Sequence, residues 1–177
     1  MDIIFCDLNV IQGFDHSKDE VTLKEDATGQ KIIIGGLPKD SLILKLDVDK
    51  AQYKKKSSYL RTNTEFIHKG CDYCVIIPSL SKIVLFELKS EHPKGYADQF
   101  VASEIFLNYC NNLWMKFKNC NQKFEFIRVL LSKKYNGQLT TSSKVVKFTK
   151  PDRTNEDIKI LSPGFPPRIR IEKFLNN

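Results

Sequence analysis

Residues 70–89 read GCDYCVIIPSLSKIVLFELK, and this stretch decides the fold. It holds two apolar runs, Tyr73–Ile77 and Ile83–Leu88, on either side of a Pro-Ser-Leu-Ser segment. Short runs that are rich in Val and Ile and interrupted by Pro and Ser are typical of two strands joined by a turn. The stretch therefore predicts a β-hairpin, around which the rest of the chain is organised.

Three charged residues lie where the two strands of this hairpin begin and end. Asp72 opens the first strand, and Glu87 and Lys89 lie near the end of the second. Because side chains alternate along a strand, Glu87 and Lys89 point to one face and Leu88 to the other. Charged groups at the end of a buried strand are costly unless they are paired. Two converging carboxylates, Asp72 and Glu87, favour a divalent cation such as Mg²⁺ or Mn²⁺. A lysine beside such a cation can orient water and stabilise charge on a phosphate, which indicates phosphodiester hydrolysis.

Asp72, followed fifteen residues later by Glu87-Leu88-Lys89, resembles the PD-(D/E)XK nuclease superfamily, which has the restriction-endonuclease-like fold. The resemblance covers roughly residues 65–131 and departs from the pattern at Cys71, where the motif has Pro. It implies a Mg²⁺- or Mn²⁺-dependent endonuclease that acts on DNA. Asp72, Glu87 and the backbone carbonyl of Leu88 would hold the metal, and Lys89 would act on the water. The alternative is a hairpin with a Glu–Lys pair on its surface.

The resemblance implies two further site residues. Glu65, seven residues before Asp72, is the nearest candidate for an additional acid from an element ahead of the hairpin. Gln99 lies in the first turn of the helix that follows the strand carrying Glu87-Leu88-Lys89, here called the E-x-K strand. It would line the site and touch the nucleic-acid strand that is cut. A solvent-facing glutamine is the alternative for Gln99. His68 is a less favoured general acid, because a lone histidine is more often structural.

Beyond the hairpin, the pattern predicts a sheet with one long helix. From Tyr96, apolar residues recur at intervals of three and four, which predicts an amphipathic helix that ends at 119–122. Residues 124–131 would return parallel to the E-x-K strand through this crossover. Further strands are predicted at 3–6, 21–24, 31–34, 41–47, 158–161 and 168–173.

We therefore expect an α/β or α+β fold, with a mixed central β-sheet, a long helix packed on it and a β-rich N-terminal extension. The 177 residues are predicted to form a single domain. Within it, the nuclease core would span about 50–135, the extension 1–49 and the C-terminal strands 140–177.

Charge favours a nucleic-acid partner. The net charge is +7, from 28 basic and 21 acidic residues, and an excess of this size suits a polyanion, most simply nucleic acid. Lys54–Lys56, with Tyr53 and Tyr59 nearby, would contact phosphates and stack on bases, or else form a solvated helix face. A merely basic soluble protein remains the alternative.

Five cysteines, an odd number in a chain that is not short, suggest a reduced cytoplasmic protein. Cys71-x-x-Cys74 and His68 invite a zinc interpretation, but a second ligand pair does not appear, so apolar packing is favoured. We expect no membrane span, because no run of eighteen apolar residues occurs, and no secretion signal.

Two other classes of function stay open. One is a non-catalytic nucleic-acid-binding subunit that keeps a nuclease-like fold, and the other is a protein-interaction module with a basic face. An active nuclease of this size could serve host defence, in antiviral defence for example, or a mobile element. It could act alone, as a homodimer or beside a partner subunit.

Overall fold

The computed structural model describes residues 10–25, 29, 31–48, 59–61, 63–89, 95–132, 158–161 and 167–175. The predicted strand at 3–6 and the lysine patch Lys54–Lys56 lie outside the described residues. In chain order the elements are β1 (Glu20–Lys24), β2 (Lys31–Gly35), β3 (Leu42–Lys45), β4 (Tyr73–Ile77), the 3-10 turn η3 (Pro78–Leu80), β5 (Lys82–Lys89), α1 (Tyr96–Lys118), β6 (Glu125–Ser132), β7 (Ile158–Leu161), β8 (Arg168–Arg170) and α2 (Glu172–Leu175).

The strands form two sheets, and the predicted hairpin, β4 and β5, lies in the larger. Its strand order is β3-β4-β5-β6-β7, antiparallel from β3 to β5 and parallel from β5 to β7. The smaller sheet has the order β1-β2-β8. The mixed α and β content and the parallel return of β6 after α1 are as predicted. β3 and β7, which the sequence assigned to the extension and to the C-terminal strands, also belong to the larger sheet.

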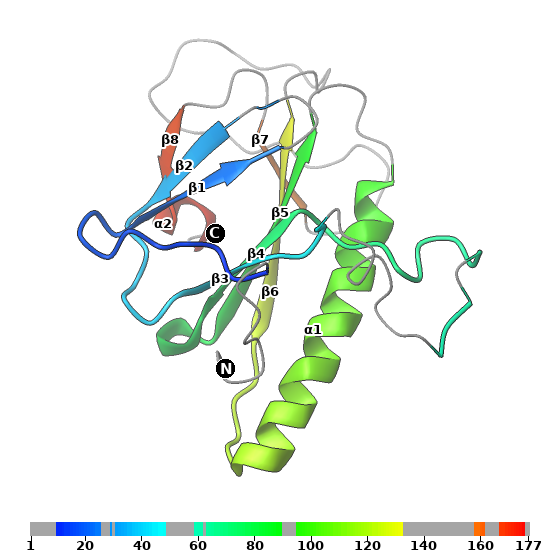
Figure 1. Ribbon diagram of the computed structural model, residues 1–177. Coiled ribbons are helices and arrows are strands. Elements are labelled where there is room, and N and C mark those ends of the chain that lie inside the picture. The colour runs from blue at the N-terminus through cyan, green and yellow to red at the C-terminus, as the bar shows by residue number, and fades with distance from the viewer. Residues whose placement is uncertain are drawn as a thin grey trace.

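The larger sheet lies between α1 on one face and the smaller sheet with α2 on the other (Figure 1). Apolar side chains point alternately to the two faces of the sheet along β5, so both faces have apolar residues to bury. Val84, Phe86 and Leu88 are buried with residues of β1, β2, β8 and α2, whereas Ile83 and Leu85 are buried with residues of α1. The hairpin is therefore covered on both faces, and a polar side chain near its end is removed from water.

Helix α1 is present as predicted, but its buried face is narrower than the apolar pattern suggests. Its buried residues are Phe100, Ser103, Leu107, Cys110 and Asn111. By contrast, Val101, Ile105, Tyr109 and Phe117, all part of the predicted apolar spacing, are exposed. The helix begins after Gly95 and ends at Asn119, and both of these residues have left-handed backbone conformations.

The predicted last strand, 168–173, is wrong in its second half. β8 ends at Arg170, and the chain then forms the short helix α2. The amide of Ile171 still donates to the Gly35 carbonyl at 2.8 Å, but β2 ends there and offers no further ladder partners. The turn buries Phe174, whose ring meets Phe86 edge-on at a centroid distance of 5.3 Å.

Neither described helix has the length and apolar character needed to cross a membrane.

Candidate active site

Strand pairing places Asp72 beside Glu87. In the antiparallel ladder, Tyr73 at the start of β4 lies opposite Phe86 of β5. Asp72, the residue just before β4, therefore lies opposite Glu87. The sheet register thus joins two carboxylates that are fifteen residues apart in sequence. Glu87 points to the α1 face, because its neighbours Phe86 and Leu88 point to the other face.

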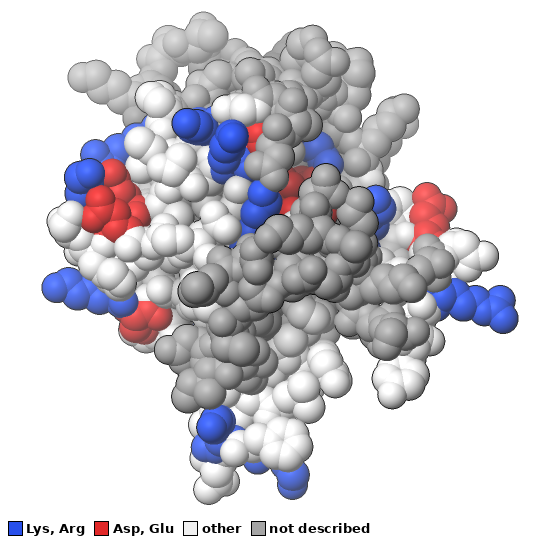
Figure 2. Space-filling view, viewed as in Figure 1, with Lys and Arg blue, Asp and Glu red and all other residues white. Residues whose placement is uncertain are grey.

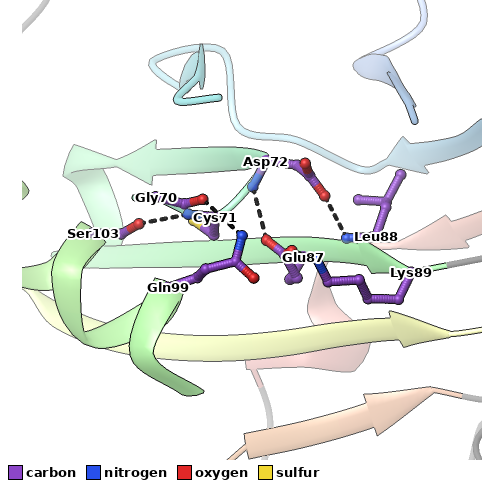
Figure 3. A network of polar contacts seen from close by, with 8 residues as sticks. All are labelled: Gly70, Cys71, Asp72, Glu87, Leu88, Lys89, Gln99 and Ser103. Atoms are coloured by element: carbon purple, nitrogen blue, oxygen red, sulfur yellow. Dashed lines mark hydrogen bonds and ion pairs between the residues drawn. The ribbon is translucent and has the colours of Figure 1, made fainter. Parts of the chain in front are cut away.

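Each of the two carboxylates accepts a hydrogen bond from the backbone of the opposite strand (Figure 3). The amide of Asp72 donates to Oε2 of Glu87 at 3.1 Å. The amide of Leu88 donates to Oδ2 of Asp72 at 2.6 Å. These two bonds lie just beyond Tyr73 and Phe86, the last residue pair of the β4–β5 ladder at this end. They fix both side chains against the sheet.

Lys89 completes the group. Its Nζ lies 2.5 Å from Oε1 of Glu87, in an ion pair in which the Glu87 side chain is 1% exposed and the Lys89 side chain is 26% exposed. Burial opposes the charge on Lys89, but the nearby Glu87 and Asp72 outweigh it, and the pKa of Lys89 is raised. Lys89 therefore stays an ammonium that reaches from solvent to a buried carboxylate.

Burial makes both acids reluctant to ionise. It raises the pKa of Glu87 to about 8, and the neighbouring Asp72 adds to this rise, while Lys89 opposes it. Burial likewise raises the pKa of Asp72 to about 6, against the hydrogen bond from Leu88 and the charge of Lys89. A nearby cation would oppose both shifts, since it favours the charged carboxylates.

Two further acids lie close enough to raise the pKa of Asp72, and neither was predicted from the sequence as a site residue. The charges of Asp47 and Glu25 both contribute to the raised pKa of Asp72. Asp47 follows Leu46, whose amide donates to the Asp72 carbonyl at 2.8 Å. The signal for Asp47 was its place directly after the apolar strand SLILKL. Glu25 follows β1 and carried no comparable signal.

Helix α1 holds the segment that leads into Asp72. Nε2 of Gln99 donates to the Gly70 carbonyl at 3.3 Å, and the amide of Cys71 donates to Oγ of Ser103 at 2.8 Å (Figure 3). Gln99 and Ser103 are four residues apart and so share one helix face. The structure thus places the side chain of Gln99 against the segment that leads into Asp72. Ser103 was not identified from the sequence, although its spacing from Gln99 was available.

Glu65 is not brought to the pair. It is exposed within a turn, and none of the hydrogen bonds or ion pairs found in the described part of the chain joins it to Asp72 or Glu87. His68 lies in the same turn and is partly buried. Cys71 and Cys74 are both buried in the apolar layer under α1, as expected for apolar packing.

The donor set suits a hard divalent cation. The bonds found among the described residues use one oxygen of Asp72 and both of Glu87, whereas two carboxylates offer about eight lone-pair positions. Oxygen atoms are therefore available to Mg²⁺ or Mn²⁺. Within the described ranges, no group of three or more His, Cys, Asp or Glu side chains gathers tightly enough to hold a metal ion by itself. A backbone oxygen or water would have to complete the coordination.

Comparisons with protein families, with curated proteins and with solved structures found no match.

Proposed function

We propose that this protein is a metal-dependent endonuclease of the PD-(D/E)XK type that hydrolyses phosphodiester bonds in DNA. The observation that carries the proposal is the joining of Asp72, Glu87 and Lys89 at the end of the central hairpin. These are the residues of the sequence motif, and they meet at one point through the backbone of two neighbouring strands.

The order of elements supports the proposal. An Asp-led strand, β4, pairs with β5, whose end carries Glu87 and Lys89, and the long helix α1 follows and leads to the parallel strand β6. This is the order that the motif implies. Gln99 in the first turn of α1 lies on the same face as Glu87, which fits its proposed place beside the site.

In this proposal, Asp72 and Glu87 hold Mg²⁺ or Mn²⁺, together with the Leu88 carbonyl. Asp47 replaces Glu65 as the candidate for an additional acid. When bound, the metal supplies Lewis-acid polarisation of a phosphate oxygen and lowers the pKa of water. Lys89 then keeps its ammonium near the reacting phosphate, where it orients the water and stabilises negative charge. Burial of Glu87 excludes water from one side of the pair.

Lysines near the pair support a nucleic-acid substrate. Lys24 and Lys31 are paired across the β1–β2 hairpin, and the amide of Lys24 donates to the Tyr73 hydroxyl at 3.2 Å. Nζ of Lys45 lies 5.9 Å from the centroid of the same ring. The ring of Tyr73 packs on the face of the larger sheet opposite α1, so these lysines would contact phosphates on that side of a bound strand. Figure 2 shows Lys and Arg side chains beside acidic ones in the upper middle of the viewed face.

The test is cleavage by the purified full chain. Plasmid, linear DNA and RNA are each incubated with Mg²⁺, Mn²⁺ or EDTA. We expect cleavage of DNA with either metal and none with EDTA. Cleavage of RNA alone would redefine the substrate, and cleavage in EDTA would contradict the metal role.

A matched control excludes a contaminating nuclease. Asp72→Asn should lose the activity, whereas Asp40→Asn should keep it. Asp40 also accepts a backbone hydrogen bond, from Ser79 at 2.6 Å, but it does so at the turn end of the hairpin. DNA binding without cleavage, under every metal condition, would instead favour a non-catalytic nucleic-acid-binding subunit.

A further inference from the structure

Helix α1 carries an exposed apolar ridge that the proposed active site does not use. The ridge consists of the exposed residues Val101, Ile105, Tyr109 and Phe117 and the partly buried Leu113, which are spaced four residues apart. Ile105, Tyr109 and Phe117 are 66%, 61% and 77% exposed. Residues four apart form a continuous row along a helix, so these side chains lie next to one another. The C-terminal part of α1 projects beyond the sheet (Figure 1).

The ridge lies on a face without charge. Between Asp98 and Lys116, the exposed residues of α1 are Val101, Ile105, Asn108, Tyr109 and Asn112. A helix face that meets only solvent is normally rich in charged residues, and 28% of this chain is charged. An uncharged exposed face with large apolar side chains is typical of a protein–protein contact surface.

The spacing of the ridge is symmetric. Tyr109 is at its centre, Ile105 and Leu113 lie four residues to either side, and Val101 and Phe117 lie eight residues to either side. A two-fold axis through Tyr109 would therefore pair Ile105 with Leu113 of a second copy, and Val101 with Phe117. Such a self-complementary patch is what an isologous dimer requires. Rows of this kind interlock at a crossing angle of about −50°, the commonest helix packing in globular proteins.

The charges at the ends of α1 favour the same arrangement. Asp98 is exposed at the N-terminal end, and Lys116 and Lys118 are exposed at the C-terminal end. Asp98 and Lys116 are eighteen residues apart, which is five helical turns, so they lie on one side of the helix. An antiparallel pair brings the acidic end of each helix toward the basic end of the other, and it opposes the two helix dipoles. A parallel pair would bring like charges together.

We propose that α1 is a homodimer interface, in which the ridges of two copies of this chain pack antiparallel about Tyr109. The proposal is independent of the nuclease activity, because the ridge contains none of the residues that form the Asp72–Glu87 site.

Sedimentation velocity of the full chain, over a range of concentrations, tests the interface. We expect a dimer for the wild type and a monomer for Tyr109→Glu and Ile105→Glu. Tyr109→Glu places two like charges at the axis, and it should raise the dimer dissociation constant at least ~100-fold. Leu80→Glu is the matched control, because it also charges an exposed apolar residue, in η3 and outside α1. Leu80→Glu should remain a dimer.

Two results would overturn the proposal. One is a wild type that stays monomeric at every concentration. The other is a dimer that survives both Tyr109→Glu and Ile105→Glu. Circular dichroism of the variants establishes that they are folded, which is expected because both side chains are exposed.

Disulfide trapping tests the antiparallel orientation. Tyr109→Cys should form a disulfide-linked dimer on mild oxidation, because the two positions meet at the axis. Phe117→Cys should not, because the two copies of that position would lie ~24 Å apart along the helices. Both are made in a Cys6→Ser, Cys120→Ser background, because Cys120 is partly exposed and Cys6 lies outside the described residues. Equal cross-linking by the two variants would contradict the antiparallel arrangement.

Discussion

Asp72 and Glu87 hold each other in place through the backbone: the amide of Asp72 donates to the Glu87 carboxylate, and the amide that follows Glu87 donates to the Asp72 carboxylate. Neither side chain can move far without loss of a hydrogen bond in a site shielded from water. The carboxylates are therefore positioned before any metal or substrate arrives. This preorganisation distinguishes the pair from acids that are close only in sequence.

Removal of either proposed metal ligand should abolish cleavage. Asp72→Asn and Glu87→Gln each remove a charged oxygen ligand but keep the shape of the side chain. We expect each variant to fold, by circular dichroism, and to lose nicking of plasmid in Mg²⁺. Asp40→Asn serves as the control for loss of a carboxylate that accepts a backbone hydrogen bond. Wild-type activity in either site variant would remove that residue from the site.

Removal of Lys89 should act on rate rather than on binding. Lys89→Ala loses an ammonium held 2.5 Å from Oε1 of Glu87, and loss of one such charge typically costs on the order of 10²–10³ in rate. Lys89→Arg should not restore the rate, because guanidinium is larger, planar and effectively never deprotonated. Single-turnover cleavage at saturating protein measures this rate. If both variants cut at the wild-type rate, Lys89 is only a partner of Glu87.

The metal-free protein should lose stability as the pH rises. Burial raises the pKa of Glu87 in the folded, metal-free protein to about 8, from an ordinary value of 4.5. The pKa of Asp72 is raised from 3.8 to about 6, which acts in the same direction. The stability from both groups is complete below these ordinary values and disappears as the pH passes the raised ones. In EDTA, we therefore expect the melting temperature to fall between about pH 5 and 8.

Glu87→Gln isolates this effect. The variant cannot ionise, so its melting temperature at pH 8 should exceed that of the wild type by at least ~3 °C, the shift that about 1 kcal/mol produces in a chain of this size. Asp15→Asn is the control, because the pKa of Asp15 is lowered to about 2, outside this pH window. A wild-type pH dependence in Glu87→Gln would show that the Glu87 carboxyl is not the titrating group.

Gln99 should contribute positioning as well as stability. Gln99→Ala frees the Gly70 carbonyl and loosens the segment before Asp72. Gln122→Ala is a matched control, because Nε2 of Gln122 donates to the Pro78 carbonyl at the turn end of the hairpin, 2.6 Å away. Each change should lower stability by about 1 kcal/mol, but only Gln99→Ala should also slow single-turnover cleavage. Equal cleavage rates in both variants would reduce Gln99 to a structural role.

Lysines near the site should control the salt dependence of DNA binding. Lys24→Ala, Lys31→Ala and Lys45→Ala should each weaken binding and reduce the slope of log K against log salt by about 1. Lys39→Ala is the control, because Lys39 lies beside Asp40, which contacts the opposite end of the hairpin. Fluorescence anisotropy over a series of salt concentrations gives the slopes. Binding that does not respond to salt would favour a protein partner.

Local sequence determined the elements and the pair of acids. The β-branched runs around Pro78, the Asp at the start of one strand and the E-x-K triplet at the end of the next predicted both the hairpin and its residues. The pattern is sufficient because the two strands are joined by a short turn, so their register follows from that turn. Helix α1 and the parallel strand β6 followed from periodicity and from the handedness of crossovers.

The tertiary structure decided which further acids approach Asp72 and which face of α1 is buried. Asp47 and Glu25 approach Asp72 from β3 and β1, in two different sheets, and sequence spacing carries no information on that approach. The apolar pattern of α1 winds around much of the helix, but one sheet can cover only one side of it. Packing on that sheet buried Phe100 and Leu107 and left Ile105 and Tyr109 in solvent. A local pattern records which residues are apolar, whereas the neighbouring elements determine which of them lose contact with water.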